Sequence, residues 1–250
     1  MMSDMMISGG TISSDGMAYK VEPFHADWHA MIAGNDISQC IPIIDRAARY
    51  FNKRANTLAV ARSVFKKAFQ QHAIEMREDA VLSTYGMKMD DFLKAGKRRF
   101  TERQFASICE RMDAVKPDCE FLVTGFDSLG RPHIFHVAAP GNDSVYDKPG
   151  FCAIGSGKWA AETILYSLGQ CIDKNLGETI YSVCAAKFMA EKSDGVGEQS
   201  YLFAKKKGTI AFSHNFSMVG QIRDAWKKDG CPKEPDGIAR RIYSFGLGFS

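Results

Sequence analysis

Two residues near the start of the chain have the types that form a catalytic ion pair, a carboxylate and a lysine. Asp4 lies in a short β-like run, and Lys20 follows at 20 − 4 = 16 positions. An ammonium group lowers the pKa of a neighbouring hydroxyl or amine, and a carboxylate keeps that ammonium charged and aimed. Taken alone, the two residues are more typical of a solvated cross-strand pair. Gly34 follows Lys20 at 34 − 20 = 14 positions.

A second set of candidate residues lies in the second half of the chain. Gly155-Ser156-Gly157 falls between a predicted strand and a predicted helix, where backbone approaches a substrate and an N–H steadies an oxyanion. Any strand-to-helix turn can use this tripeptide, and Ser156 lacks the Gly-x-Ser-x-Gly context of an independent nucleophile. Asp194 follows the next predicted helix, with Glu191 as the alternative carboxylate. A plain loop role for Asp194 is an equally good interpretation.

The elements that position the first set are predicted from hydrophobic period and turn residues. Strands are expected over residues 3–8, 18–24 and 28–33, followed by helices over 37–51, 57–83, 90–95 and 101–114. Pro42 favours a start of the first helix a few residues after 37. Thr101 and Gln104 fit a capping box at the start of the last one.

The second half of the chain switches to a period of two. Strands are expected over 120–126, 133–138 and 151–154, with a loop over 140–150. Helices are expected over 158–172 and 177–192. A hairpin of 201–204 with 209–212 and a loose tail over 231–250 complete the chain. Helix pairs between antiparallel hairpins predict an α+β fold in which two stacked sheets carry helices outside, a four-layer αββα sandwich. No boundary indicates a second domain, so residues 1–250 are expected to form one.

Composition is that of an ordinary globular protein, with 45% hydrophobic and 24% charged residues. A net charge of +3 gives no reason to expect a nucleic-acid partner. The seven cysteines are odd in number and irregularly spaced, which favours reduced thiols and a cytoplasmic location over a disulfide framework. We expect no metal site, because no histidine has ligand partners at suitable spacing. We also expect no membrane span, signal peptide or cofactor.

The order of elements and the two spacings resemble the proteasome β-type branch of the N-terminal-nucleophile (Ntn) hydrolases. In that family a carboxylate, a lysine and an Ala-Gly occur at the spacings of Asp4, Lys20 and Ala33-Gly34. The resemblance covers roughly residues 3–52 and 117–213, and 53–116 would be an enlarged helical region. It implies site roles for Asp4, Lys20, Ser156 and Asp194. It also implies substrate contacts from Gly34, Gly155 and Gly157.

The family's N-terminal threonine has no counterpart at the matching position. Repeating the 16-residue spacing gives 4 − 16 = −12, so the nucleophile would lie about 12 positions before Met1 and the first strand is missing. Thr11 after Gly10 resembles a propeptide cleavage point, but it lies only nine residues before Lys20 and cleavage there would remove Asp4. Gly197 also stands where the family has a serine.

Two functions remain open on this basis. The first is a proteasome-like hydrolase of peptide or amide bonds, assembled as a ring-type homo-oligomer on peptide or protein substrates, with its nucleophile strand truncated. The second is a non-catalytic proteasome-like subunit or scaffold that binds partners through the added helices. Losing a central strand leaves unpaired backbone groups, so the 250-residue form is expected to be poorly soluble.

Overall fold

The computed structural model describes residues 1–9, 12–14, 19–51, 55–207, 212–213, 216–229 and 237–244. The chain is an α+β protein whose main sheets are both antiparallel. Thr11 lies outside the described residues, as do 231–236 of the predicted tail and part of the predicted strand 209–212.

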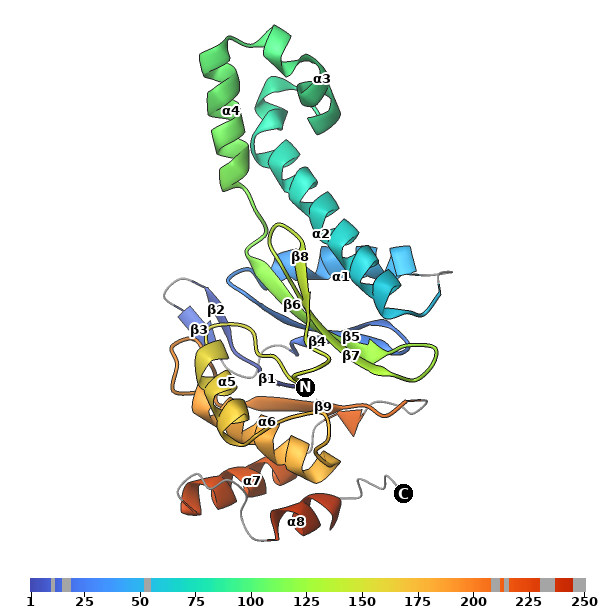
Figure 1. Ribbon diagram of the computed structural model, residues 1–250. Coiled ribbons are helices and arrows are strands. Elements are labelled where there is room, and N and C mark those ends of the chain that lie inside the picture. The colour runs from blue at the N-terminus through green and yellow to red at the C-terminus, as the bar shows by residue number, and fades with distance from the viewer. Residues whose placement is uncertain are drawn as a thin grey trace.

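The larger sheet has five strands in the order β4-β5-β6-β7-β8. Its strands are β4 (Val21–His25), β5 (Trp28–Gly34), β6 (Cys119–Phe126), β7 (Pro132–Ala138) and β8 (Asn142–Val145). Because side chains alternate between the two faces of a strand, Trp28, Ala30 and Ile32 lie on one face of β5, and all three are buried. Helices α1 (Cys40–Phe51) and α2 (Leu58–Ala80) cover that face. The chief core of the molecule therefore lies between these two helices and the sheet (Figure 1).

The ends of α1 and α2 have local causes. The predicted first helix begins as a 3₁₀ turn, Ile37–Gln39, and becomes α-helical at Cys40, so the shift anticipated from Pro42 is confirmed. Thr57 caps α2, because its Oγ1 accepts the backbone N–H of Val60 at 3.3 Å.

A smaller sheet lies on the opposite face of the five-stranded sheet. It has the order β1-β9-β10, formed by β1 (Met2–Asp4), β9 (Ser200–Ala204) and β10 (Phe212–Ser213). Phe203 of β9 packs between the sheets against Met31 and Leu122. On the outer side, α6 (Leu176–Ala190), α7 (Phe216–Lys228) and α8 (Ile238–Ser244) share a core with Met2 and Leu202. Figure 1 shows the small sheet below the large one, with α7 and α8 lowest.

Residues 82–114, the second part of the enlarged region 53–116, form an arm at the far end of α2. The arm contains a 3₁₀ turn (Leu82–Tyr85), α3 (Met89–Arg99) and α4 (Glu102–Ala114). A core cluster of its own holds it together around Leu82, Phe92 and Ile108. The predicted Thr101 capping box is present at the start of α4. Figure 1 shows the arm projecting away from both sheets.

Several expected boundaries are wrong. Residues 151–154 are not a strand: Phe151 and Ala153 are buried alternately, as the pattern indicated, but no neighbouring strand pairs with them. The predicted strand 3–8 is split between β1 and β2 (Ile7–Gly9), which pairs with β3 (Ile12–Ser14).

Other elements were missed or shortened. Strand β8 lies inside the expected loop 140–150, because its backbone pairs with β7 without a hydrophobic pattern of its own. Helix α7 was not anticipated, and the expected loose tail over 231–250 is wrong for α8, because Ile238 and Ile242 are buried in the core with α6 and α7. Helix α5 (Lys158–Ser167) is shorter than the expected helix 158–172. It ends two residues before Gly169, whose left-handed backbone (φ +64°) does not continue a helix.

Candidate functional site

All seven residues singled out in the sequence line one cavity of about 640 Å³. They come from two distant parts of the sequence, the first 34 residues and residues 155–194. They are Asp4, Lys20, Gly34, Gly155, Ser156, Gly157 and Asp194. The cavity lies between α6 on one side and strands β5, β6 and β7 on the other, beside β1. The fold therefore brings together residues that are up to 194 − 4 = 190 positions apart.

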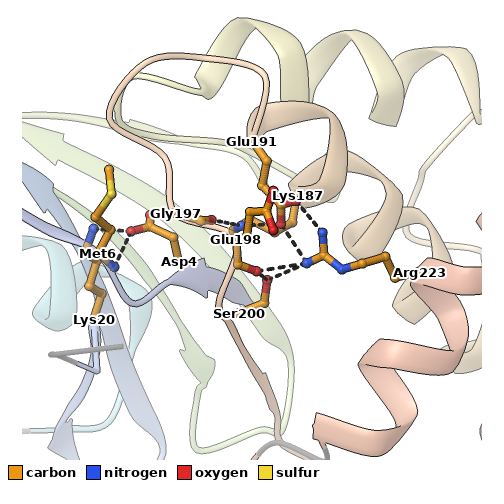
Figure 2. A network of polar contacts seen from close by, with 9 residues as sticks. All are labelled: Asp4, Met6, Lys20, Lys187, Glu191, Gly197, Glu198, Ser200 and Arg223. Carbon is orange, nitrogen blue, oxygen red and sulfur yellow. Dashed lines mark hydrogen bonds and ion pairs between the residues drawn. The ribbon is translucent and has the colours of Figure 1, made fainter. Parts of the chain in front are cut away.

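Asp4 and Lys20 form a tight ion pair inside this cavity. Lys20 Nζ donates to Asp4 Oδ1 at 2.6 Å, and the two side chains are only 14% and 16% exposed. The same Oδ1 accepts the backbone N–H of Met6 at 2.9 Å, which holds the carboxylate in place (Figure 2). Because the two side chains are mostly shielded from solvent, the field of the ammonium on a neighbouring group is screened less than at a fully exposed surface. The solvated surface pair considered from sequence is therefore excluded.

The Gly155–Gly157 turn is anchored by a residue that sequence reasoning missed. The N–H of Gly155 donates to Glu120 Oε1 at 2.8 Å, while Glu120 Oε2 lies 2.6 Å from His136 Nε2. These contacts, led by that with His136, lower the pKa of Glu120 despite its burial. Because the N–H of Gly155 already has an acceptor, the N–H groups that this turn can offer to an oxyanion are those of Ser156 and Gly157.

Close backbone contacts explain why glycine occupies two of these positions. Gly34 has a φ of +147°, and a Cβ there would lie 2.3 Å from the carbonyl oxygen of Asp118. Gly155 has a φ of +81°, and its Cβ would lie 3.3 Å from Ala33 Cβ. The Ala33-Gly34 segment and the Gly155 turn therefore pack against each other across the cavity wall.

Ser156 faces the loop that carries Asp194. A Cβ on Gly195 would lie 3.5 Å from Ser156 Oγ, so the hydroxyl is close to this loop. Both Ser156 and Asp194 are exposed to solvent within the open cavity. Among the described residues, Asp194 has no hydrogen bond to Ser156 or Lys20. The structure thus brings Asp194 to the cavity without joining it to the ion pair.

Glu191, the alternative carboxylate, belongs to a buried charge network behind the cavity. Lys187 Nζ donates to Glu191 Oε1 and to the carbonyl of Gly197, each at 2.7 Å, and Arg223 also binds Glu191 (Figure 2). Burial lowers the pKa of Lys187, and its bond to Glu191 opposes that shift. Lys187 lines the cavity and ties the end of α6 to the loop that carries Asp194. Its i,i+4 spacing to Glu191 was the sequence signal for this pair.

The described cavity residues offer no activated nucleophile. Hydroxyl or thiol groups in the lining belong to Ser3, Thr124, Cys152, Ser156 and Thr179, and none of them hydrogen-bonds to Lys20 or Asp4. Burial raises the pKa of the Cys152 thiol to about 11, which keeps it protonated and unreactive at neutral pH. The ion pair therefore has no described group to activate.

Comparisons with known proteins do not assign the chain. No protein-family model matches it, and no curated protein matches it either. Over the described residues, no group of three potential ligands is placed to hold a metal ion. Within the same ranges, no helix combines the length and the apolar character needed to cross a membrane.

Proposed function

We propose that the chain is the body of an Ntn hydrolase of the proteasome β type, which cleaves peptide or amide bonds. Its two facing sheets with helices outside each would then be the four-layer αββα sandwich of that family. One observation carries the proposal. The residues matched by the resemblance converge on one cavity, and their central pair is mostly shielded from solvent, with a 2.6 Å contact between Lys20 and Asp4.

The chemistry assigns a role to each part of the cavity. The nucleophile is the N-terminal residue of a segment upstream of Met1, and its own α-amine takes the proton of the attacking hydroxyl. Lys20 lowers the pKa of that hydroxyl and amine through its field, and Asp4 keeps Lys20 charged and oriented. A backbone N–H of Ser156 or Gly157 stabilises the oxyanion, and the Ser156 and Asp194 side chains border the amine.

N-terminal sequencing and intact mass of the protein from its native source form the first test. We expect a chain that begins with Thr, Ser or Cys about 12 positions before Met1, the position given by 4 − 16 = −12. A β-lactone electrophile should then add covalently to that residue. A chain that begins at Met1 and takes up no label would overturn the proposal.

A matched pair of variants of the native-length chain tests the role of Lys20. Lys20→Met should slow labelling by about 100-fold or more, since the nucleophile loses the cation that activates it. Lys192→Met removes an exposed lysine beyond the network and should leave the labelling rate unchanged. Equal rates for the two variants would remove Lys20 from the site.

A non-catalytic subunit or scaffold is the second candidate. The lack of an activated nucleophile among the described cavity residues favours it, and the projecting arm offers a surface for partners. N-terminal sequencing and labelling distinguish the two proposals, since a scaffold is expected to begin at Met1 and not to react with the electrophile.

The resemblance further supports a ring-type homo-oligomer in the cytoplasm that uses no cofactor. Light scattering of the native-source protein would give its subunit number. A monomer would argue against the ring under either proposal.

A further inference from the structure

The arm meets the body of the molecule again at the edge of the candidate cavity. Four residues, 115–118, connect the end of α4 to the start of β6 (Figure 1). The first residue of β6, Cys119, pairs with Gly34, the last residue of β5. Gly34 and its neighbour Asn35 both line the cavity. The return connection of the arm, residues 115–118, therefore lies directly beside the candidate site.

Asp118 holds this edge of the cavity with both its side chain and its backbone. Asn35 Nδ2 donates to Asp118 Oδ2 at 2.6 Å, and the backbone N–H of Asp118 donates to Gln39 Oε1 at 3.1 Å. The carbonyl oxygen of Asp118 leaves no room for a side chain at Gly34, where a Cβ would lie 2.3 Å from it. Asn35 and Asp118 are both exposed, so neither side chain supports the core. The segment 34–39 is thus fixed by one residue of the return connection.

The other end of the return connection is tied to α2. Arg77 Nε donates to the carbonyl oxygens of Met112 and Val115, at 3.1 and 3.2 Å. Met112 is buried in the core cluster of the arm, so this anchor is part of the arm's packing. Pro117 lies between the anchor and Asp118, and its ring fixes its own φ angle and restricts the residue before it. The link from the arm to Asp118 is therefore short and stiff.

The outgoing side of the arm is joined to α2 in a different way. Lys88 Nζ donates to Glu78 Oε2 at 3.0 Å, and the N–H of Met89 donates to Oε1 of the same carboxylate at 2.7 Å. These bonds hold the start of α3 to the end of α2, and none of the three residues lines the cavity. Within the described range 55–207, the return side of the arm is thus the one that continues to the cavity edge.

We propose that Asp118 is a positioning residue through which the arm sets the place of the Gly34–Asn35 edge of the cavity. A partner that holds the arm in another orientation moves the return connection, and Asp118 passes the displacement to Asn35. The resemblance to the Ntn hydrolases does not cover residues 53–116, so this control belongs to the present chain. The link stands on the contacts above, and only its effect on substrate rests on the proposed function, in which Gly34 contacts the substrate.

Amide exchange of the full chain, read by mass spectrometry over residues 34–39, tests the role of Asp118 without an assay of activity. Asp118→Ala should speed exchange in this segment about 10-fold, since Asn35 loses its acceptor. Asp118→Asn should leave it unchanged, because the amide oxygen still accepts from Asn35. Unchanged exchange in the alanine variant, or equal acceleration in both variants, would remove Asp118 from this role.

A change at the far end of the link tests whether the arm acts through it. Arg77→Met should also speed exchange over 34–39, although Arg77 lies outside the cavity lining. Lys88→Met is the matched control, because it breaks the outgoing anchor and should leave that exchange unchanged. Arg77→Met should add nothing in the Asp118→Ala background, since the two changes break one link. Equal effects of Arg77→Met and Lys88→Met, or additive effects in the double variant, would overturn the proposal.

Labelling of the native-length chain by a β-lactone that carries a peptide gives a second readout. Asp118→Ala should raise the reagent concentration at half-maximal labelling rate about 10-fold and leave the maximal rate within about twofold, because the edge binds and does not react. Asp118→Asn should restore both values. A lower maximal rate at an unchanged half-maximal concentration would contradict the positioning role.

Failure of the link and failure of the hydrolase proposal give different results. Exchange that responds to Arg77→Met and Asp118→Ala, in a protein that no electrophile labels, keeps the link and removes the hydrolase. Labelling of the protein with exchange that ignores both changes does the reverse.

Discussion

The two faces of the five-stranded sheet differ sharply. On the face covered by α1 and α2, aromatic rings fill the space between layers: Phe65 contacts Phe24, Phe121 and Phe135 edge to face at 5.0 to 6.3 Å between centroids. On the other face, Leu122, Thr124 and Ile134 border an open cavity that also holds the partly exposed Asp4–Lys20 ion pair. The first face supplies stability, and the second supplies the polar groups and space that chemistry needs.

The largest expected effect compares core truncations on the two faces. Phe65→Ala should lower the free energy of unfolding by about 3–5 kcal/mol, because Phe65 is fully buried among rings and leaves a void. Ile134→Ala should cost about 1–2 kcal/mol, since Ile134 already borders the open cavity and is half-buried. Urea denaturation measures the loss of unfolding free energy in both variants. Equal losses would show that the two faces of the sheet are packed equally well.

A second comparison sets the buried charge network beside a surface ion pair. Glu191→Gln should cost about 3 kcal/mol, because Lys187 is left buried with an uncompensated charge. Glu75→Gln breaks the pair with Arg46, where Glu75 is 40% exposed, and should cost less than about 1 kcal/mol. Urea denaturation again decides. Limited proteolysis should also cut residues 193–198 faster in the first variant only.

A third prediction concerns pH and the cavity face of β5. Burial lowers the pKa of His29 from 6.5 to about 4, and Lys205 adds to the shift. Between these two pH values His29 is protonated in the unfolded chain but neutral in the folded chain. The free energy of unfolding therefore falls by roughly 2–3 kcal/mol as pH drops from 6.5 to 4. His29→Phe should show a shallower loss over that window, measured by Tm against pH. An unchanged slope would show that His29 is accessible to protons when folded.

The smallest effect tests whether the arm is stabilised separately from both faces. Thr101→Ala removes the capping box of α4 and should cost about 1 kcal/mol locally. Amide exchange within α4 should speed up while the main thermal transition stays in place. Ser107→Ala, at an exposed position within the same helix, is the control and should not speed up that exchange. A shift of the main transition would show that arm and sheets unfold together.

Local signals in the sequence predicted much of the first face and little of the second. The helices that cover the first face follow from hydrophobic period and from Pro42, both of which act within a few residues. The approach of Asp4 to Lys20 in a site was expected only from the resemblance to the Ntn hydrolases. The contacts of Glu120 with Gly155 and of Glu191 with Arg223 join distant segments, so they have no local signature.

The missed and misassigned strands share one cause. A strand exists only where a neighbour bonds to it, and alternating burial alone does not supply that neighbour. Residues 151–154 have the alternation without a neighbour, whereas β8 has the neighbour β7 without the alternation.

Helix α2 gives the molecule a mechanical link between its outermost part and its core. Its 23 residues form a rod about 35 Å long, which starts on the five-stranded sheet and ends in the arm. A tilt of about 5° at the sheet would swing the far end by about 3 Å, so torque applied at α3 or α4 is felt at Phe65 and Phe69. A force applied to the arm is thus transmitted through α2 to the aromatic core.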